Sequence, residues 1–410
     1  MKKYIIIFII IFLLTGCSLY DEYKKPKNVL LKTKNKTYEV YSKHKIKDLI
    51  EKKNVEILNN NEEINTKKLG KQEAIIEYKY KLFKHKLKVE YEVLDTTPPT
   101  LITAKLDYVS NINEEIDFCS NTKYIDNYDR KVKCSVDGEY DLSKKGNYSL
   151  NYVFKDNSNN TTIESFNLSV NDPDDIEEQD YYDDEFFEEE KEKIEDNGIK
   201  FTDVKNAHKK ENTMIGIDVS RWQGDIDFNK VKNAGAEFVI LRMAVSNGPK
   251  DEIGLDSYYK KNILKAKKAG LKVGVYVYTS ASSEKEVINQ AKFVRKELHK
   301  TKLDFPIAYD FESWDEIQEY KLNKYDLMNY VDKFYEEVHK DGYDVMLYGS
   351  KLYLEKAWEN KKYPVWLAHY VPNYYDTSSY EGEYDMWQIA SDGIIDGING
   401  DVDIDIYYKK

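Results

Sequence analysis

Apolar and polar residues alternate with two different periods along the chain, and the change falls near residue 213. Up to about residue 171, apolar side chains recur at every second position in short runs such as "YSLNYVF" (148–154). This is the period of a strand with one buried face. From Met214 onward, near-continuous apolar runs alternate with stretches of helical period. The pattern predicts a region of strands followed by a region in which strands and helices alternate.

Eight apolar runs in the C-terminal region are candidate strands. They cover residues 214–220, 238–244, 272–279, 306–313, 344–350, 364–370, 385–391 and 402–408. Helical patterns separate the early runs, and the later connections are too short for full helices. Buried strands that alternate with helices indicate a parallel sheet covered on both faces. We therefore predict an irregular, TIM-like α/β barrel of eight strands and about five helices over residues 213–410.

The N-terminal region contains an internal repeat. The stretch Lys67–Asp95 aligns with Ser143–Asp172, and each copy has a glycine, an alternating strand, a turn and a second alternating strand. This pattern predicts two small all-β sandwiches, at 28–94 and 95–171. The entry "DTTPPT" and the hairpin "GNYSLNYVFKDNSNN" of the second copy resemble bacterial Ig-like domains. The match is looser for the first copy. The resemblance implies a spacer or a wall-adhesion unit.

Charge is distributed unevenly. The chain has 62 Lys and Arg against 74 Asp and Glu, a net charge of −12, which argues against general nucleic-acid binding. Acidic residues crowd the stretch "DPDDIEEQDYYDDEFFEEEKEKIEDNG", which has few aliphatic residues. Such a composition does not bury a core, so we predict an acidic linker over residues 172–212.

The first residues are typical of an export signal. Two lysines precede the apolar run "YIIIFIIIFLL", which is short for a membrane span. The run ends in "LTGC" (Leu14–Cys17), which resembles a bacterial lipobox. The resemblance implies cleavage after residue 16, a diacylglyceryl group on Cys17 and a tether over 17–27. The predicted location is the outer face of the cell membrane, facing the cell wall; an ordinary secretory peptide is the alternative.

Two other cysteines remain, Cys119 and Cys134. Export permits a disulfide, and their separation suits neighbouring strands. We predict a bridge, with two free thiols as the alternative. No group of Cys and His has zinc-ligand spacing, and we predict neither metal nor cofactor. The acidic turn Asp126–Asp129 is a minor candidate for Ca²⁺.

The fourth predicted strand, "PIAYDFES" (306–313), ends with two carboxylates one residue apart. Side chains at positions i and i+2 of a strand point to the same side. Asp310 and Glu312 therefore share one face, with Cα atoms roughly 6.6 Å apart. Two such carboxyls in a partly dry site do not both ionise at ordinary pKa values, so one is expected to act as an acid.

Other strand ends carry further acids and aromatic residues. In a barrel these ends form the ligand-binding face. Asp218 ends the first strand, and the last strand contributes Asp403 or Asp405. The predicted substrate-binding residues are Tyr276, Tyr348, Trp366, Tyr370, Trp387 and Arg242. Acids ringed by aromatic side chains are typical of a carbohydrate site, because sugar rings stack on aromatic faces and paired carboxylates cleave glycosidic bonds.

Motifs in this region resemble glycoside hydrolase family 25, the Chalaropsis-type lysozymes. They are "GIDVSRWQGDIDF", "FVILRMA", "PIAYDFE", "VMLYGS", "YPVWLAHY", "DMWQIASDG" and "INGDVDIDIYY", in family order. By this resemblance Glu312 is the general acid/base, Asp310 its partner, and Asp218 and Asp403 the supporting acids. Asp401 replaces the usual Asn of the last motif, which makes the Asp403 assignment the least secure.

The resemblance implies hydrolysis of the β-1,4 bond between N-acetylmuramic acid and N-acetylglucosamine in peptidoglycan, with net retention. Asp310 then acts either as nucleophile or by orienting the substrate's own 2-acetamido group, and we favour the second role. The expected partners are glycan strands of peptidoglycan and, through the lipid, a membrane. The alternatives are a non-catalytic wall-binding lipoprotein that uses the barrel to hold glycan, and an enzyme acting on another acetylated glycan.

Overall fold

The computed structural model describes residues 31–34, 36–80, 82–173, 198–246, 248, 252–359 and 362–409. The chain divides into two compact units, Met1–Thr97 and Pro98–Lys410. The predicted signal peptide, Cys17, the tether and most of the acidic linker lie outside the described residues. In the part that is described, no helix combines the length and apolar character needed to cross a membrane.

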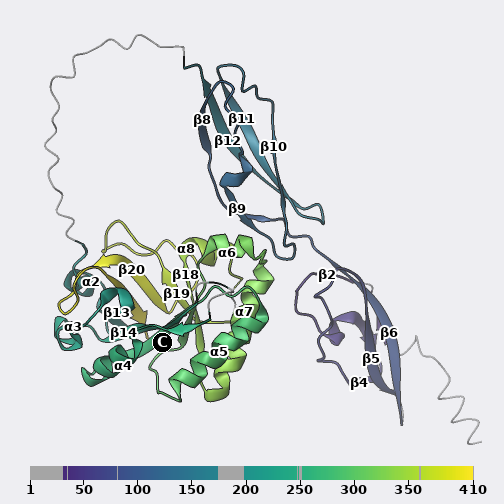
Figure 1. Cartoon of the computed structure of the whole chain (residues 1–410). Helices are drawn as coiled ribbons and strands as arrows, with labels where there is room; N and C mark the ends of the chain where they lie inside the picture. Colours follow the sequence, from purple (N-terminus) through teal and green to yellow (C-terminus); the bar gives the residue numbers. More distant parts are fainter. Residues whose placement is uncertain are drawn as a thin grey trace, which may run out of the picture. The chain divides into compact units, whose positions relative to one another are not determined.

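Eight strands close into a barrel, as predicted (Figure 1). In spatial order they are β13 (Thr213–Val219), β21 (Val402–Tyr408), β20 (Met386–Gly393), β19 (Val365–Ala368), β18 (Val345–Ser350), β17 (Ile307–Asp310), β16 (Lys272–Tyr278) and β14 (Phe238–Val245). Pairing of β13 with β14 closes the ring, and the short β15 (Gly254–Leu255) adds to β14.

The last strand departs from the predicted parallel sheet. β21 runs antiparallel to both of its neighbours, β13 and β20. Antiparallel strands can be joined by a short connection, whereas a parallel pair needs a long crossover. This explains why the sequence between β20 and β21 is too short for a helix. It also places Asp403, at the start of its strand, directly opposite Asp218 near the end of β13.

Seven α-helices occur in the described residues, against about five predicted. They are α2 (Phe201–His208), α3 (Phe228–Ala234), α4 (Tyr259–Lys268), α5 (Glu284–Leu298), α6 (Trp314–Glu319), α7 (Lys324–Val338) and α8 (Lys351–Lys356). The two that the sequence missed are α2 and α6. Helix α2 lies in the stretch assigned to the acidic linker, and α6 directly follows the residues assigned to the fourth strand.

Helix α2 lies inside the stretch predicted to be a linker. Its Phe201 and Val204, three residues apart, are buried in the same apolar core as the barrel strands. The residue before the helix, Lys200, forms a β-bridge with Ile394. The barrel unit therefore begins at about residue 198 rather than 213, and the prediction of a linker up to residue 212 is wrong at its C-terminal end.

Strand β17 shows why acids can occupy a buried strand. Tyr309 and Phe311 face outward into the apolar layer beneath the helices, where Tyr309 packs on Phe334 of α7. Ala308 belongs to the separate apolar cluster inside the barrel. Because side chains alternate along a strand, Asp310 follows Ala308 to the inside. Glu312 lies two residues beyond the end of the strand. The outward residues hold the strand in place, so the inward positions are free to carry polar groups.

The two N-terminal β-modules share one topology. The first contains β1 (Leu31–Thr33), β2 (Thr37–Glu39), β3 (Ile50–Lys53), β4 (Glu56–Ile57), β5 (Gly70–Tyr80) and β6 (Phe83–Leu94); the second contains β7 (Thr100–Ala104), β8 (Asp107–Asn111), β9 (Thr122–Ile125), β10 (Lys133–Asp137), β11 (Gly146–Lys155) and β12 (Thr161–Asn171). Their sheet orders, β2-β6-β5-β4 and β8-β12-β11-β10, correspond strand for strand. The repeat therefore extends over both modules, while their Ig-like character stays a prediction.

The predicted disulfide is confirmed. Cys119 is bonded to Cys134, with the two Cα atoms 6.0 Å apart. Cys119 begins a short 3₁₀ turn before β9, and Cys134 lies in β10. The disulfide thus links the connection between β8 and β9 to β10, an edge strand of the four-stranded sheet in the second module.

The second module packs against the barrel, although a spacer was expected. Arg130 forms an ion pair with Asp326 at 2.8 Å, and the Asn323 amide donates to the carbonyl of Tyr128 at 2.6 Å. Ile102 and Ile125 of the module join the apolar core of the barrel. The Arg130 and Tyr128 contacts meet the start of α7, at Asp326 in its first turn and at its N-cap Asn323.

We expect Asn323→Ala to lower the free energy of unfolding of this unit by about 1–2 kcal/mol, because Asn323 is the N-cap of α7. Asn323→Asp keeps the capping oxygen but loses the donor to Tyr128, so it should cost about 1 kcal/mol. Denaturation followed by tryptophan fluorescence measures both losses. An unchanged midpoint for the Ala variant would show that the cap adds nothing.

Candidate functional site

The barrel mouth holds a cavity of about 440 Å³. Its lining residues are Asp218, Arg221, Trp222, Arg242, Val245, Tyr276, Tyr278, Asp310, Glu312, Tyr348, Trp366, Tyr370, Gln388 and Asp403. The structure therefore brings together all four predicted catalytic acids and every predicted substrate-binding residue except Trp387. They come from all eight barrel strands, or from the residues that directly follow them.

Trp387 does not reach the cavity. Met386 and Gln388 point into the barrel, so the residue between them points out. Trp387 is 1% exposed, packs edge-on against His208 of α2, and donates its indole N–H to the carbonyl of His369. Its prediction as a substrate-binding residue is wrong because the inward face of its strand was not assigned.

Asp310 and Glu312 differ in their surroundings. Asp310 is buried, and its Oδ1 has no hydrogen-bond partner among the described residues. Glu312 opens to solvent in the mouth of the cavity. Burial and then the charge of Glu312 raise the pKa of Asp310 well above its usual range, while Arg242 opposes this rise. Partial burial also raises the pKa of Glu312. The pair therefore holds on to a proton at a pH where isolated carboxyls would have lost it.

Arg242 is fixed by a carboxylate that sequence reasoning missed. Its Nε donates to Oδ2 of Asp256 at 2.9 Å, and the backbone N–H of Arg221 donates to the same oxygen. Asp256 is 4% exposed. The sequence feature that could have pointed to Asp256 is its position in the stretch "GLDSYY", which follows β14 along the chain. The pairing holds the guanidinium in the wall of the cavity, where its charge acts on Asp310.

A hydrogen-bond network orients Asp218. The side-chain amide of Gln388 donates to Oδ2 of Asp218 at 2.7 Å. The carbonyl oxygen of that amide accepts from the hydroxyls of Tyr348 and Tyr370, both at 2.9 Å. Two donors at the oxygen leave the amide one orientation, with its NH₂ group toward Asp218. Tyr348 and Tyr370 thus position Asp218 through Gln388.

The two acids of β21 lie at different depths. Asp403 is partly exposed, and burial raises its pKa to about 7. Asp405 is fully buried and does not line the cavity. The sequence left open which of them belongs to the mouth; the geometry favours Asp403.

Aromatic side chains stand at the rim of the cavity. Trp222 is 73% exposed and Tyr370 is 51% exposed, which is high for such large rings. The Arg221 guanidinium lies 4.6 Å from the centre of the Trp222 ring. Exposed rings beside an acidic cavity offer flat apolar faces to a sugar polymer.

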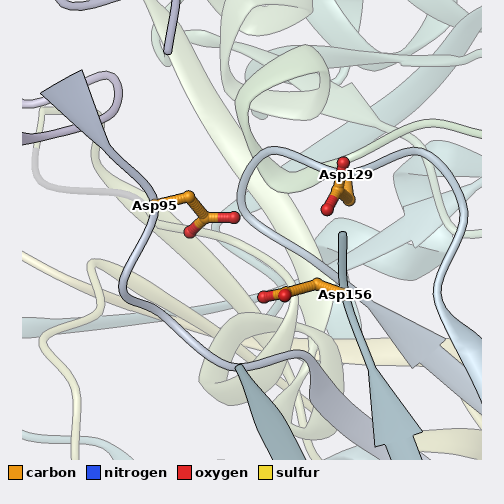
Figure 2. Close-up of side chains that lie close together, drawn as sticks. All are labelled: Asp95, Asp129 and Asp156. Atoms are coloured by element: carbon orange, nitrogen blue, oxygen red, sulfur yellow. The ribbon is translucent and has the colours of Figure 1, made fainter. Parts of the chain in front are cut away.

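Another pair of acids lies in the second β-module. The carboxylates of Asp129 and Asp156 approach within 4.8 Å of each other (Figure 2). Both already accept hydrogen bonds, Asp129 from Asn157 and Asp156 from Asn160.

Comparison with known proteins identifies the barrel. The model of the family "Glycosyl hydrolases family 25" matches residues 217–398. YegX of Escherichia coli, a protein without assigned function, is 30% identical over 198 residues, which cover 48% of this chain and 70% of YegX. The chain belongs to glycosyl hydrolase family 25. As a family 25 member it is a glycoside hydrolase.

For two further relatives, the matched region covers a smaller share of the relative. The autolytic lysozyme of Clostridium acetobutylicum is 30% identical over 202 residues, 47% of this chain and 55% of that protein. The autolysin LytC of Streptococcus pneumoniae is 26% identical, with a TM-score of 0.42 over 49% of this chain and 48% of LytC. The chain thus spans about half the length of each. The family 25 match includes Asp218, Asp310 and Glu312 but ends before Asp403.

Proposed function

We propose that this family 25 enzyme is a lysozyme that hydrolyses the β-1,4 bond between N-acetylmuramic acid and N-acetylglucosamine in peptidoglycan. The observation that carries the proposal is the Asp310–Glu312 pair inside an acidic cavity with exposed aromatic rings at its rim. The family membership supports hydrolysis of a glycosidic bond. The similarity to lysozymes supports peptidoglycan as the substrate.

Glu312 acts as the general acid and then as the general base. It is the more accessible member of the pair, so it can reach the oxygen of a glycosidic bond lying across the mouth. Burial raises its pKa, which favours the protonated form that a general acid needs. Asp310 works as the carboxylate. Burial and the charge of Glu312 raise its pKa well above the usual range, and Arg242 is the cation that opposes this rise and favours the ionised form. The reaction needs this division of roles. One carboxyl donates the proton, and the other stabilises the positive charge that develops at the anomeric carbon.

Asp310 acts by orienting and charge-stabilising the substrate's 2-acetamido group, which attacks the anomeric carbon. Direct attack by Asp310 is the second possibility. In both routes water then opens the intermediate while Glu312 takes its proton, so the configuration is retained. Asp218 and Asp403 supply negative charge that stabilises the oxocarbenium-like transition state. The rim aromatics and Arg242 position the glycan.

The enzyme acts outside the cytoplasm, held to the membrane by a lipid on Cys17. The export signal and the "LTGC" motif support this part of the proposal. The disulfide between Cys119 and Cys134 agrees with an oxidising compartment.

Mass spectrometry of digested peptidoglycan tests the bond. The full chain, purified in detergent, is incubated with cell walls, and the soluble fragments are reduced with borohydride. Fragments ending in reduced N-acetylmuramic acid are expected. Reduced N-acetylglucosamine ends would mean that another bond is cut. Binding to several wall types without any fragments would favour the non-catalytic wall-binding alternative, and a first product with the α-configuration by proton NMR would exclude retention.

A further inference from the structure

A short 3₁₀ turn after β13 (Arg221–Gln223), here called the rim turn, carries a cation that the reaction described above does not use. The side chain of Arg221 is exposed and lines the cavity. Among the described residues its guanidinium has no ion pair and no hydrogen bond, and its one contact of note is with the ring of Trp222. The other cation in the cavity lining, Arg242, is paired with Asp256. Arg221 is therefore the cation that a ligand can reach.

Hydrogen bonds hold the rim turn in one conformation. The backbone N–H of Arg221 donates to Oδ2 of Asp256 at 2.9 Å. The side-chain carbonyl of Gln223 accepts from the backbone N–H of Ser220 at 2.9 Å, and its amide nitrogen donates to the carbonyl of Asp401 at 3.2 Å. The turn is thus anchored both to the cavity wall and to the segment that leads into β21. Because the backbone is fixed before a ligand arrives, less conformational entropy is lost on binding.

The rim turn places a positive charge next to a flat apolar surface. The guanidinium of Arg221 lies 4.6 Å from the centre of the Trp222 ring, and Trp222 is 73% exposed. This large exposed fraction leaves area on which a sugar can stack. A guanidinium on an aromatic ring keeps its N–H groups available, and their planar fork matches the two oxygens of a carboxylate. A ligand that contacts both side chains combines a sugar face with an anionic group beside it.

The other charges of the cavity restrict where such an anion can lie. Asp218, Asp310, Glu312 and Asp403 line the cavity and repel a negative group that enters it. The rim beside Arg221 is the part of the cavity lining where a carboxylate of the substrate gains attraction. Of the two sugars in the proposed substrate, N-acetylglucosamine is neutral, whereas N-acetylmuramic acid has a lactyl group that ends in a carboxyl.

We propose that Arg221 is a specificity-determining residue, which binds a carboxylate attached to the N-acetylmuramic acid unit while the glycan stacks on Trp222. In glycan without peptide this is the lactyl carboxylate itself. In glycan with peptide it is a carboxylate of the peptide joined to the lactyl group. The inference rests on the proposed function, because a neutral glycan offers Arg221 no anion. It gives the site a means to prefer muramyl glycan over neutral polymers of N-acetylglucosamine.

Binding to the full chain that carries Glu312→Gln tests recognition without cleavage. Isothermal titration calorimetry compares three soluble glycans: one with its peptides, one freed of peptides, and the peptide-free glycan with its carboxyls converted to methylamides. At least one of the two carboxylate glycans should bind about 10-fold more tightly than the amide, as for one charge-assisted hydrogen bond at an exposed site. Adding Arg221→Gln should remove this preference. The carboxylate glycan that loses affinity identifies the source of the carboxylate.

Lys230→Gln is the matched control. Lys230 is exposed on α3 and does not line the cavity, so its replacement removes one positive charge away from the site and should leave all three affinities unchanged. Equal affinities with and without Arg221→Gln would overturn the inference and leave the proposed function standing. An equal loss for all three glycans would show that Arg221 merely supports the Trp222 ring, which also overturns it. Binding of none of the three would contradict the proposed function and the inference together.

Discussion

Glu312→Gln should leave the fold intact and lower the rate of glycan cleavage by about 10³-fold or more. General acid–base catalysis contributes about 10²–10⁴-fold, and glutamine cannot release a proton to the leaving oxygen. Glu312 is exposed in the cavity mouth, so its replacement removes no packing. The free energy of unfolding should therefore change by less than about 0.5 kcal/mol. The measurements are the rate of release of reduced fragments and the denaturation midpoint.

Glu319→Gln is the matched control for this variant. Glu319 is the last residue of α6, is exposed and does not line the cavity. The control makes the same chemical change seven residues away and should cleave like the wild type. A folded Glu312→Gln protein with normal activity would show that another group supplies the proton.

Asp310→Asn should lower kcat/KM by about 10²–10³-fold, because a buried charge that faces the developing positive charge is lost. The basic limb of the pH profile should also move to lower pH. The sign follows from the pair: a negative Asp310 makes it harder for Glu312 to lose its proton, so removing that charge lowers the pKa of Glu312. Rates measured between about pH 4 and 9 report both effects.

Asp344→Asn serves as the control for Asp310→Asn. Asp344 precedes β18, is exposed and does not line the cavity, so neither the rate nor the limb should change. A limb that stays in place in Asp310→Asn would mean that the two carboxyls do not interact. Glycan without N-acetyl groups separates the two roles of Asp310. Cleavage of that glycan by the wild type would indicate direct attack by Asp310.

The features that follow from local periodicity were predicted from the sequence. Apolar runs identified the eight barrel strands, and the i, i+2 spacing put Asp310 and Glu312 on one face opposite Tyr309 and Phe311. Both results depend on a few neighbouring residues and on the geometry of a strand. Because the strand ends of a barrel form its ligand-binding face, their positions in the sequence were enough to predict that Asp218 and Asp403 lie in the same cavity.

Features that depend on which strands are neighbours could not be predicted. Trp387 and Gln388 are adjacent in sequence, and only the pairing of β20 with β21 shows which one faces inward. The reversed direction of β21 makes Asp403 the partner of Asp218 and puts Asp405 below it. The packing of the second β-module on the start of α7 joins Arg130 to Asp326, almost two hundred residues later in the chain. No window of local sequence contains that information.

The parallel pairing of the outer strands gives each β-module a direction of mechanical strength. Strand β8, near the start of the second module, runs parallel to β12 at its end, in register over five residue pairs. In the first module β2 runs parallel to β6 in the same way. A pull that separates the two ends of a module slides these strands past each other, so their hydrogen bonds are loaded together in shear rather than peeled apart in sequence. Force applied between the two ends of a module is therefore carried along these strands without unravelling them from one end.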